Sequence, residues 1–303
     1  MEEQFLTSTL SRESIPLRTD DLAKHFVREL RTALGGGEAA SVTRLIMEDV
    51  FGYRNGNRPR MLTEDEELLA WVTLNRLHGG EPVQYVTGIA DFYGLQLKVT
   101  PAVLIPRPET EELVEWILDD HPTGTVKRVV DLGTGSGCIP LALQARRPEW
   151  LCEGVDKSEE ALEVALDNRE MLNSTVLFKV ADLLSDRFTR DSHYDIVVSN
   201  PPYIPPSERE QMGPSVLEHE PAIALFVPED DPLIFYRKVG ELAITGLKAG
   251  GNLYVETNEH NSDRVMKLFR DQGFGDVVRK KDLQGKWRMV RCRREASPPA
   301  DRP

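Results

Sequence analysis

Apolar residues recur at helical spacing through the first eighty residues of the chain. The segment 20–34 and the segment that follows it place apolar side chains three or four positions apart, which is typical of amphipathic helices. Thr63 followed by Glu66 fits a capping box, so a third helix is expected to begin there and to end at a Gly-Gly pair. Its apolar positions are Leu68, Leu69, Val72 and Leu77. This pattern predicts a small helical bundle.

Strands and helices alternate in the rest of the chain. Aromatic and β-branched residues with two glycines predict a hairpin from Gln84 to Thr100, and a helix is expected near 109–119. Strands are predicted near 127–131, 151–155, 176–181, 194–199 and 251–256. Helices are expected near 138–147, 158–172, 233–248 and 261–272, and two final runs, 276–281 and 287–293, are expected to pair as an antiparallel edge. Such alternation predicts an α/β fold with a mostly parallel, doubly wound sheet.

These patterns divide the chain into five parts. Residues 1–19 lack clear periodicity and form a predicted N-terminal extension. The helical domain covers 20–83, the hairpin and connector cover 84–120, and the sheet domain covers 121–294. The tail, 295–303, is rich in Ser, Pro and charge, which predicts disorder.

Composition and charge narrow the classes of function. No apolar run of 18 residues and no signal peptide occurs, so we expect a cytoplasmic protein without membrane contact. Three widely spaced cysteines predict neither a disulfide framework nor a metal site. The 37 Lys and Arg against 50 Asp and Glu give a net charge of −13, which counts against a nucleic acid partner. A basic segment at 279–294 is either a solvated strand face or an RNA contact.

A glycine-rich turn follows the first strand of the predicted sheet. It reads Asp131-Leu132-Gly133-Thr134-Gly135-Ser136-Gly137 and leads into a helix. Glycines let the backbone approach a ligand at the carboxyl edge of the sheet. Dinucleotide loops read Gly-x-Gly-x-x-Gly, whereas this spacing, with an Asp before it, suits the smaller S-adenosylmethionine. The carboxylate of that cofactor can meet free N–H groups at the helix start.

Two further aspartates close the second and third predicted strands. Asp156 lies where a carboxylate can accept both ribose hydroxyls as charge-assisted hydrogen bonds. Asp182, with Leu183 beside it, can receive the adenine amino group. An aspartate at a strand end also commonly caps the next helix. Three aspartates in register with the glycine loop and Asn200 nevertheless predict a cofactor site.

The fourth predicted strand, 194–199, leads directly into Asn200-Pro201-Pro202-Tyr203. Paired prolines can neither continue a sheet ladder nor enter a helix interior, so the chain leaves the sheet as a stiff, extended loop. An amide or adenine nitrogen is a poor nucleophile because its lone pair is delocalised, so positioning must supply much of the catalysis. The Asn200 oxygen and a carbonyl freed by Pro201 and Pro202 can accept both N–H bonds of a planar NH₂ group, on which Tyr203 can stack. These residues predict an N-methyltransferase.

From about residue 20 to 294 the chain resembles the peptide chain release factor N5-glutamine methyltransferases, the HemK-like family. Besides the glycine loop and Asn-Pro-Pro-Tyr, the matching motifs are Gly80-Glu81-Pro82-Val83-Gln84-Tyr85, Leu104-Ile105-Pro106-Arg107-Pro108-Glu109-Thr110-Glu111, His219-Glu220-Pro221 and Asp282-Leu283-x-Gly285-x-x-Arg288. The resemblance implies a seven-stranded methyltransferase sheet behind a helical domain that docks the release factor. It also implies S-adenosylmethionine as the cofactor and, as the substrate, the glutamine of the Gly-Gly-Gln motif.

The resemblance also implies roles for individual residues. Gly133 to Gly137 and Asp156 would hold the cofactor, and Asn200 to Tyr203 would hold the glutamine amide. Arg107 and Glu109 would lie near the cofactor and substrate entrance. The chain departs from the family at Leu183, where an aromatic residue is common, and in the loop 226–230, where glycines are common.

Other functions fit parts of the sequence. A related family methylates glutamine in a ribosomal protein, but it usually has Ser where this chain has Pro108-Glu109-Thr110. Asn-Pro-Pro-Tyr would also serve an enzyme that methylates an adenine or guanine amino group in RNA or DNA. The acidic charge and the lack of a basic target-recognition domain count against that alternative. A cofactor-binding module without catalysis is disfavoured by Asn200 and Tyr203.

Overall fold

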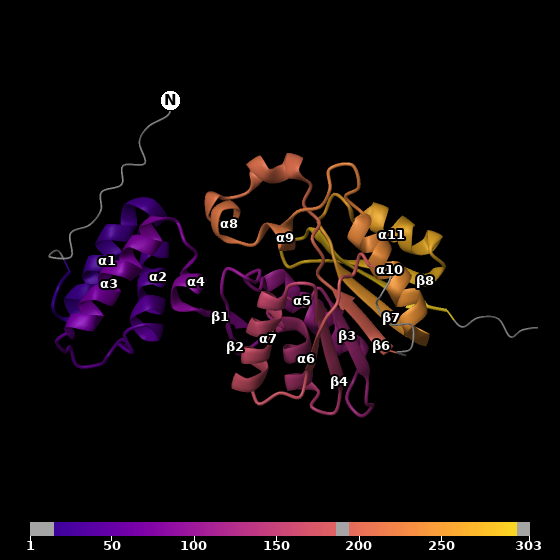
Figure 1. The fold of residues 1–303 in the computed structure, drawn as a ribbon, viewed down its shortest axis with the longest axis horizontal. Helices are drawn as coiled ribbons and strands as arrows, with labels where there is room; N and C mark the ends of the chain where they lie inside the picture. Colours follow the sequence, from indigo (N-terminus) through magenta and orange to yellow (C-terminus); the bar gives the residue numbers. More distant parts are fainter. Residues whose placement is uncertain (1–14, 186–193, 296–303) are drawn as a thin grey trace, which may run out of the picture. The chain divides into compact units, whose positions relative to one another are not determined.

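The computed structural model describes residues 15–185 and 194–295, which form two compact units. The first unit runs to Gly88 and also includes Gly213–His219, and the second unit begins at Ile89 (Figure 1). Apart from 15–19 and Glu295, the predicted N-terminal extension and tail lie outside the described residues. None of the helices in the described ranges combines the length and the apolar character that a membrane span requires.

The first unit is a helical bundle, as predicted. Its elements are α1 (Thr19–Leu34), α2 (Gly36–Asp49), α3 (Glu64–His78), α4 (Val83–Thr87) and α8 (Pro214–His219). Phe26 and Leu30 of α1, Ile46 of α2 and Leu74 of α3 share one buried cluster. The α2 helix begins at Gly36, the second of three consecutive glycines, so Gly36 and Gly37 are helical although a run of glycines commonly breaks a helix.

The α3 helix begins with the predicted capping box. The Thr63 hydroxyl accepts the Glu66 amide at 3.2 Å, and the Glu66 carboxylate accepts the Thr63 amide at 2.9 Å. Of the four apolar positions, only Leu77 is buried; the other three, Leu68, Leu69 and Val72, are 43%, 42% and 38% exposed. The helix instead buries Ala70, Thr73, Leu74 and Leu77. It therefore presents an apolar strip on its outer side.

The second unit opens with a hairpin of β1 (Ile89–Phe92) and β2 (Leu95–Lys98). This hairpin is shorter than the one predicted from Gln84 to Thr100, because residues 83–87 form α4. Gly88, with a φ of 76°, ends that helix in the left-handed conformation that glycine adopts without strain.

The central sheet has seven strands. Their order is β5 (Leu177–Val180), β4 (Leu151–Asp156), β3 (Arg128–Leu132), β6 (Tyr194–Ser199), β7 (Leu247–Glu256), β9 (Trp287–Arg294) and β8 (Phe274–Lys281). Neighbours from β5 to β7 are parallel, whereas β9 runs antiparallel to both β7 and β8. The predicted sheet and its antiparallel edge are therefore confirmed.

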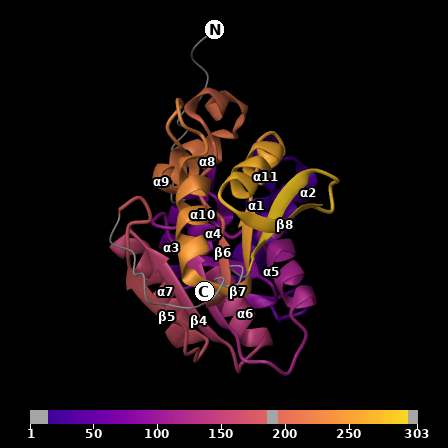
Figure 2. The same ribbon diagram turned by 90° about the vertical axis from the view of Figure 1, so that its right-hand side faces the viewer.

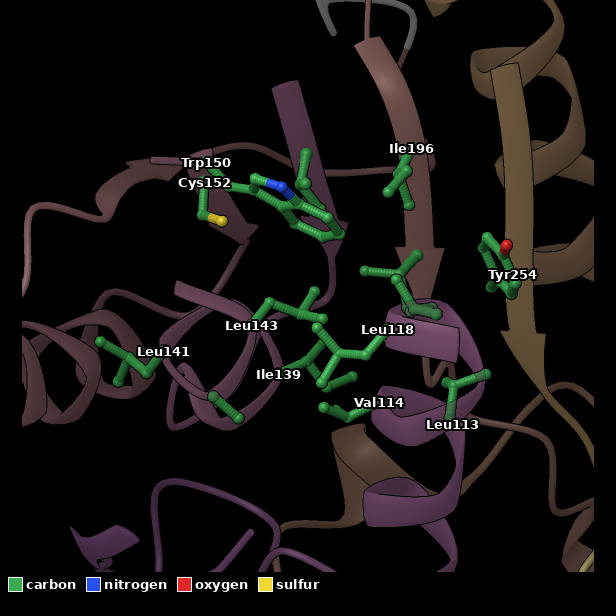
Figure 3. Packing of buried hydrophobic residues seen from close by; sticks show 14 of the residues in the cluster. Leu113, Val114, Leu118, Ile139, Leu141, Leu143, Trp150, Cys152, Ile196 and Tyr254 are labelled. Atoms are coloured by element: carbon green, nitrogen blue, oxygen red, sulfur yellow. The ribbon is translucent and has the colours of Figure 1, made fainter. Parts of the chain in front are cut away.

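Helices cover both faces of the sheet (Figures 1 and 2). One face carries α5 (Pro108–Asp120), α6 (Cys138–Arg146) and α7 (Glu159–Met171), and the other carries α10 (Ile234–Gly246) and α11 (Ser262–Asp271). Under the first face, Leu113 and Val114 of α5 and Ile139 of α6 pack beside Ile196 of the sheet (Figure 3). Each such buried side chain contributes about 1.5–3 kcal/mol. The connection after β6 adds a 3₁₀ turn (Pro206–Gln211) and α9 (Ala222–Leu225).

Candidate active site

A cavity lies within the second unit at the carboxyl ends of β3, β4 and β6. Its volume is about 120 Å³, whereas one water needs roughly 10–15 Å³. The chain runs outward from β3 through β4 to β5 and then crosses to β6 on the other side of β3. Ligands of open α/β sheets bind at such switch points. The cavity is therefore a ligand site by both size and position.

Backbone hydrogen bonds to β4 shape the glycine loop. The amides of Gly133 and Thr134 donate to the Val155 carbonyl, each at 2.9 Å, and the Gly135 amide donates to Asp156 Oδ2 at 2.8 Å. Gly135 has a φ of 52°, and a Cβ added there would meet no protein atom within 4 Å. The loop thus presents bare backbone to open space.

Gly137 fixes the point at which α6 begins. Its φ is 79°, and a Cβ there would lie 2.7 Å from the Phe178 ring. Ser136 before it and Cys138 after it both line the cavity. Because the first N–H groups of a helix lack partners within the helix, this start offers donors to an anionic group.

Asp131, a predicted cofactor residue, lies behind the loop and outside the cavity lining. It is buried and accepts the Thr134 hydroxyl at 2.7 Å, while its Oδ1 atom has no hydrogen-bond partner among the described residues. Burial raises the pKa of Asp131 to about 7, against the opposing effect of the Thr134 hydrogen bond. A buried carboxylate of this kind favours a cationic ligand nearby.

The two strand-end aspartates line the cavity, as does Leu183. Asp156 also accepts the Ser158 amide at 3.1 Å, and Asp182 accepts the Leu184 amide at 2.9 Å. Both side chains are therefore fixed by local backbone, as in a helix cap or turn. Their predicted contacts with ribose and adenine remain compatible with this arrangement, because each carboxylate oxygen can accept a second hydrogen bond.

The segment after β6 forms another part of the wall, through Asn200, Pro201 and Pro202. The Asn200 Nδ2 atom donates to the Thr110 hydroxyl at 3.1 Å. Tyr203 does not line the cavity; its ring packs against the core under α10, and its hydroxyl lies 3.5 Å from Glu256. Burial raises the pKa of Tyr203, so this phenol stays protonated at neutral pH.

The connector residues predicted near the entrance differ in position. Arg107 lines the cavity and forms an ion pair with Glu220, a buried residue of the His-Glu-Pro motif. Glu220 also accepts the Ile105 amide at 3.3 Å, so it holds this stretch of connector in place. Glu109 lies in the first turn of α5 and does not reach the cavity lining.

Sequence reasoning missed several residues of the cavity wall. Lys157 and Ser158 directly follow Asp156 in the sequence, so their closeness to a predicted cofactor residue could have identified them. Other missed residues are apolar and come from a loop, from α9 or from α10, where no motif marks them: Ala102, Val103, Ile223, Ala224 and Phe235.

Half of the basic side chains of the C-terminal segment lie within ion-pair distance of an acidic side chain. Arg279 lies 2.8 Å from Asp263, and Arg291 lies 2.8 Å from Asp120 and 2.9 Å from Asp276. These pairs favour the solvated strand face over an RNA contact.

Comparison with known proteins assigns the family. The model of the Methyltransferase small domain matches residues 110–218. The chain is 42% identical to the release factor glutamine methyltransferase of Bacteroides thetaiotaomicron over 219 residues, 72% of this chain and 78% of that protein. It is 35% identical to that of Flavobacterium psychrophilum over 273 residues, 88% and 95% of the two chains. The chain belongs to the release factor glutamine methyltransferase family.

A structural likeness agrees on the fold. The hMettl16 catalytic domain, solved in complex with the MAT2A 3'UTR hairpin 6, has a TM-score of 0.54 at 18% identity and covers 82% of this chain and 88% of its own. Family and fold together make the chain an S-adenosylmethionine-dependent methyltransferase, as predicted.

The residues of the cavity fit this cofactor. Bare backbone at Gly135 leaves space for a ligand, and the start of α6 offers N–H donors to a carboxylate. Asp156 on the wall can accept hydroxyl groups, and the buried carboxylate of Asp131 complements positive charge.

Proposed function

We propose that this enzyme methylates the side-chain amide nitrogen, N5, of the glutamine in the Gly-Gly-Gln motif of a peptide chain release factor. The observation that carries the proposal is the Asn200 amide on the wall of the same cavity that the glycine loop lines. The curated relatives named as release factor glutamine methyltransferases support the choice of substrate. Because this substrate acts in translation, we place the enzyme in the cytoplasm.

The chain's own residues would position the amide for attack. S-adenosylmethionine supplies a methyl group on a sulfonium, which is a strong electrophile. The Asn200 oxygen and the carbonyl of Pro201 would accept the two N–H bonds of the substrate amide and aim its nitrogen. Pro202 would keep this loop rigid. Tyr203, predicted to stack on the planar group, packs against the core instead and would anchor the end of the loop. As the N–C bond forms, the S–C bond would break and leave a neutral thioether, and the methylated nitrogen would release its proton afterwards. No general base is therefore needed to begin.

The cofactor would be held by the part of the wall that follows β3, β4 and β5. Gly133, Thr134, Gly135, Ser136 and Gly137 would border its methionine part with closely approaching backbone, and N–H groups at the start of α6 would meet its carboxylate. The ribose hydroxyls would bind Asp156, and the adenine would bind between Asp182 and Leu183. Arg107, held by Glu220, would border the substrate entrance together with Glu109.

The helical region, predicted at 20–83, would dock the release factor. The exposed apolar strip of α3 supports this role, because adjacent exposed Leu and Val side chains are typical of surfaces that bind proteins. The acidic charge of the chain supports a protein substrate rather than a nucleic acid.

The test is to incubate the enzyme with isotopically labelled S-adenosylmethionine and an unmethylated release factor, and to locate the label by peptide mass spectrometry. We expect one methyl group on the Gly-Gly-Gln glutamine. A release factor with that glutamine replaced by alanine is the control. Label only on a ribosomal protein or on RNA, tested in parallel, would overturn the substrate; no label on any of them would overturn the proposed activity.

A further inference from the structure

Glu256 is a buried carboxylate for which the proposed mechanism has no use. It is the last residue of β7, opposite Met289 of β9, and is 2% exposed. Its backbone carbonyl accepts the Tyr236 hydroxyl at 3.0 Å, which fixes the strand end. Burying a carboxylate is costly unless its oxygens are hydrogen-bonded, so its partners are informative.

A short chain of hydrogen bonds leads from Glu256 to the active site. The Thr110 hydroxyl, itself buried, donates to Glu256 Oε2 at 2.7 Å. The same hydroxyl oxygen accepts Asn200 Nδ2 at 3.1 Å. Thr110 and Asn200 both line the cavity, whereas Glu256 does not. Among the described residues, Thr110 is the hydrogen-bonded link from Glu256 to the cavity wall.

The direction of these bonds follows from the donors available. An ionised carboxylate can only accept, so the single hydroxyl hydrogen of Thr110 must point to Glu256. The hydroxyl can then only accept from Asn200, so the Asn200 NH₂ group must face Thr110. An asparagine amide has its oxygen and nitrogen on opposite sides, so the oxygen is left for the cavity. If the Asn200 amide were reversed, its NH₂ group would face the substrate NH₂ group. Both groups donate, so no hydrogen bond could form between them.

We propose that Glu256 and Thr110 are positioning residues that hold the Asn200 amide with its oxygen toward the substrate nitrogen. This inference rests on the proposed function, since it specifies how Asn200 comes to accept an N–H bond of the glutamine amide. It assigns Thr110 and Glu256 to the reaction although neither is expected to touch the transferred methyl group.

A protonated Glu256 would no longer fix the orientation of the Asn200 amide. A protonated carboxyl can donate to Thr110, which frees the hydroxyl hydrogen to turn to Asn200 and stabilises the reversed amide. Burial raises the pKa of Glu256 to about 7. Of the groups that face Glu256, the Glu109 carboxylate of α5 raises this pKa further. Hydrogen bonds from Thr110 and Tyr203 and the charge of Arg288 of β9 lower it. Cys138 of α6 and Tyr236 of α10 also interact with Glu256. The rate of transfer should therefore fall as the pH decreases through about 7.

Isosteric variants test the proposal. Thr110→Val keeps the shape but removes the hydroxyl, and we expect kcat to fall at least tenfold while the cofactor Kd, measured by calorimetry, changes less than about threefold. Thr110→Ser should recover most of the lost rate. Thr245→Val, at an exposed site on α10, is the control for the same chemical change.

Glu256→Gln should lower kcat at pH 8 and abolish the decline of kcat between pH 8 and 6.

The outcomes separate this inference from the function on which it rests. If the wild type methylates the glutamine but Thr110→Val is as active, or if Thr110→Ser is as impaired as Thr110→Val, the positioning role is wrong. Should Thr110→Val not fold, a Glu256→Gln variant with the same pH profile as the wild type would overturn it. Absence of methylation by the wild type overturns the proposed function instead.

Discussion

At the scale of single residues, the Asp156 carboxylate joins the glycine loop to the end of β4. One oxygen accepts the Gly135 amide and the other accepts the Ser158 amide. Each oxygen can accept one more bond, which is what two ribose hydroxyls require. The same side chain would therefore shape the loop and hold the cofactor.

We expect Asp156→Ala to weaken cofactor binding by about 1–3 kcal/mol, the scale of hydrogen bonds to a charged group. Calorimetric titration with S-adenosylhomocysteine measures this directly. Asp271→Ala, which removes an exposed carboxylate of α11, is the control and should bind normally. Unchanged affinity in Asp156→Ala would mean that the ribose binds elsewhere.

Among the site residues, the sequence marked those that stand in a motif. Asn200 and Gly135 could be identified because prolines or glycines at fixed spacing limit what the backbone can do. Glu256 carries no such mark, since its role depends on contact with Thr110, 146 positions away. Tyr203 was identified, but its burial against the core under α10 depends on tertiary packing.

At the scale of secondary structure, the capping box of α3 ties local sequence to stability. Thr63→Ala removes the acceptor for the Glu66 amide, and we expect a loss of about 1 kcal/mol in the free energy of unfolding. Thr63→Ser keeps the acceptor and should lose much less. Urea unfolding followed by far-UV circular dichroism compares them. Equal stability of Thr63→Ala and wild type would contradict the role of the cap.

The outer side of α3 offers a test of the docking role. Leu69→Glu and Val72→Glu place charge on an exposed apolar strip without touching the helical core. If the release factor binds there, KM for the release factor should rise at least fivefold, while the cofactor Kd stays constant. Val126→Glu, at an exposed site of the second unit, is the matched control. An unchanged KM would remove this strip from the docking surface.

Hydrophobic periodicity predicted the elements well where burial is regular. The strand 194–199 was placed with its bounds, because an apolar run ended by two prolines allows few alternatives. Residues 84–87 were predicted as part of the hairpin but belong to α4, since a helix of five residues is too short to show a helical period. The core side of α3 was misplaced because it uses Ala70 and Thr73, which are small or polar.

At the scale of the whole molecule, two buried carboxylates link stability to pH. Burial raises the pKa of Asp131 and of Glu256 to about 7, from 3.8 and 4.5. The folded state then holds these protons more tightly than the unfolded chain does. Their contribution to stability is full below about pH 4 and is lost as the pH rises through about 7.

Glu256→Gln removes one of these groups. Relative to the wild type, its free energy of unfolding should increase by up to about 3 kcal/mol between pH 4.5 and 8, since one pKa unit corresponds to about 1.4 kcal/mol. Denaturant unfolding of both proteins without cofactor across this range measures the difference. Parallel stability curves would show that the Glu256 carboxyl titrates normally.

The cavity also shows what whole-chain folding adds to the sequence. The ends of β3, β4 and β6 could be placed together in advance, because parallel strands end at one edge of a sheet. The wall supplied by Ile223 and Phe235 could not, since apolar residues in a loop or a helix look alike whether they line a ligand site or a core.

The central claim is that Asn200 aims the substrate amide and takes little part in holding the cofactor. Single-turnover methylation of the release factor by Asn200→Ala, at saturating S-adenosylmethionine, tests it most directly. The account predicts a rate at least a hundredfold below wild type, about 2.7 kcal/mol in the barrier, with cofactor affinity within about threefold. A near-normal rate, or a loss explained by weaker cofactor binding, would contradict it.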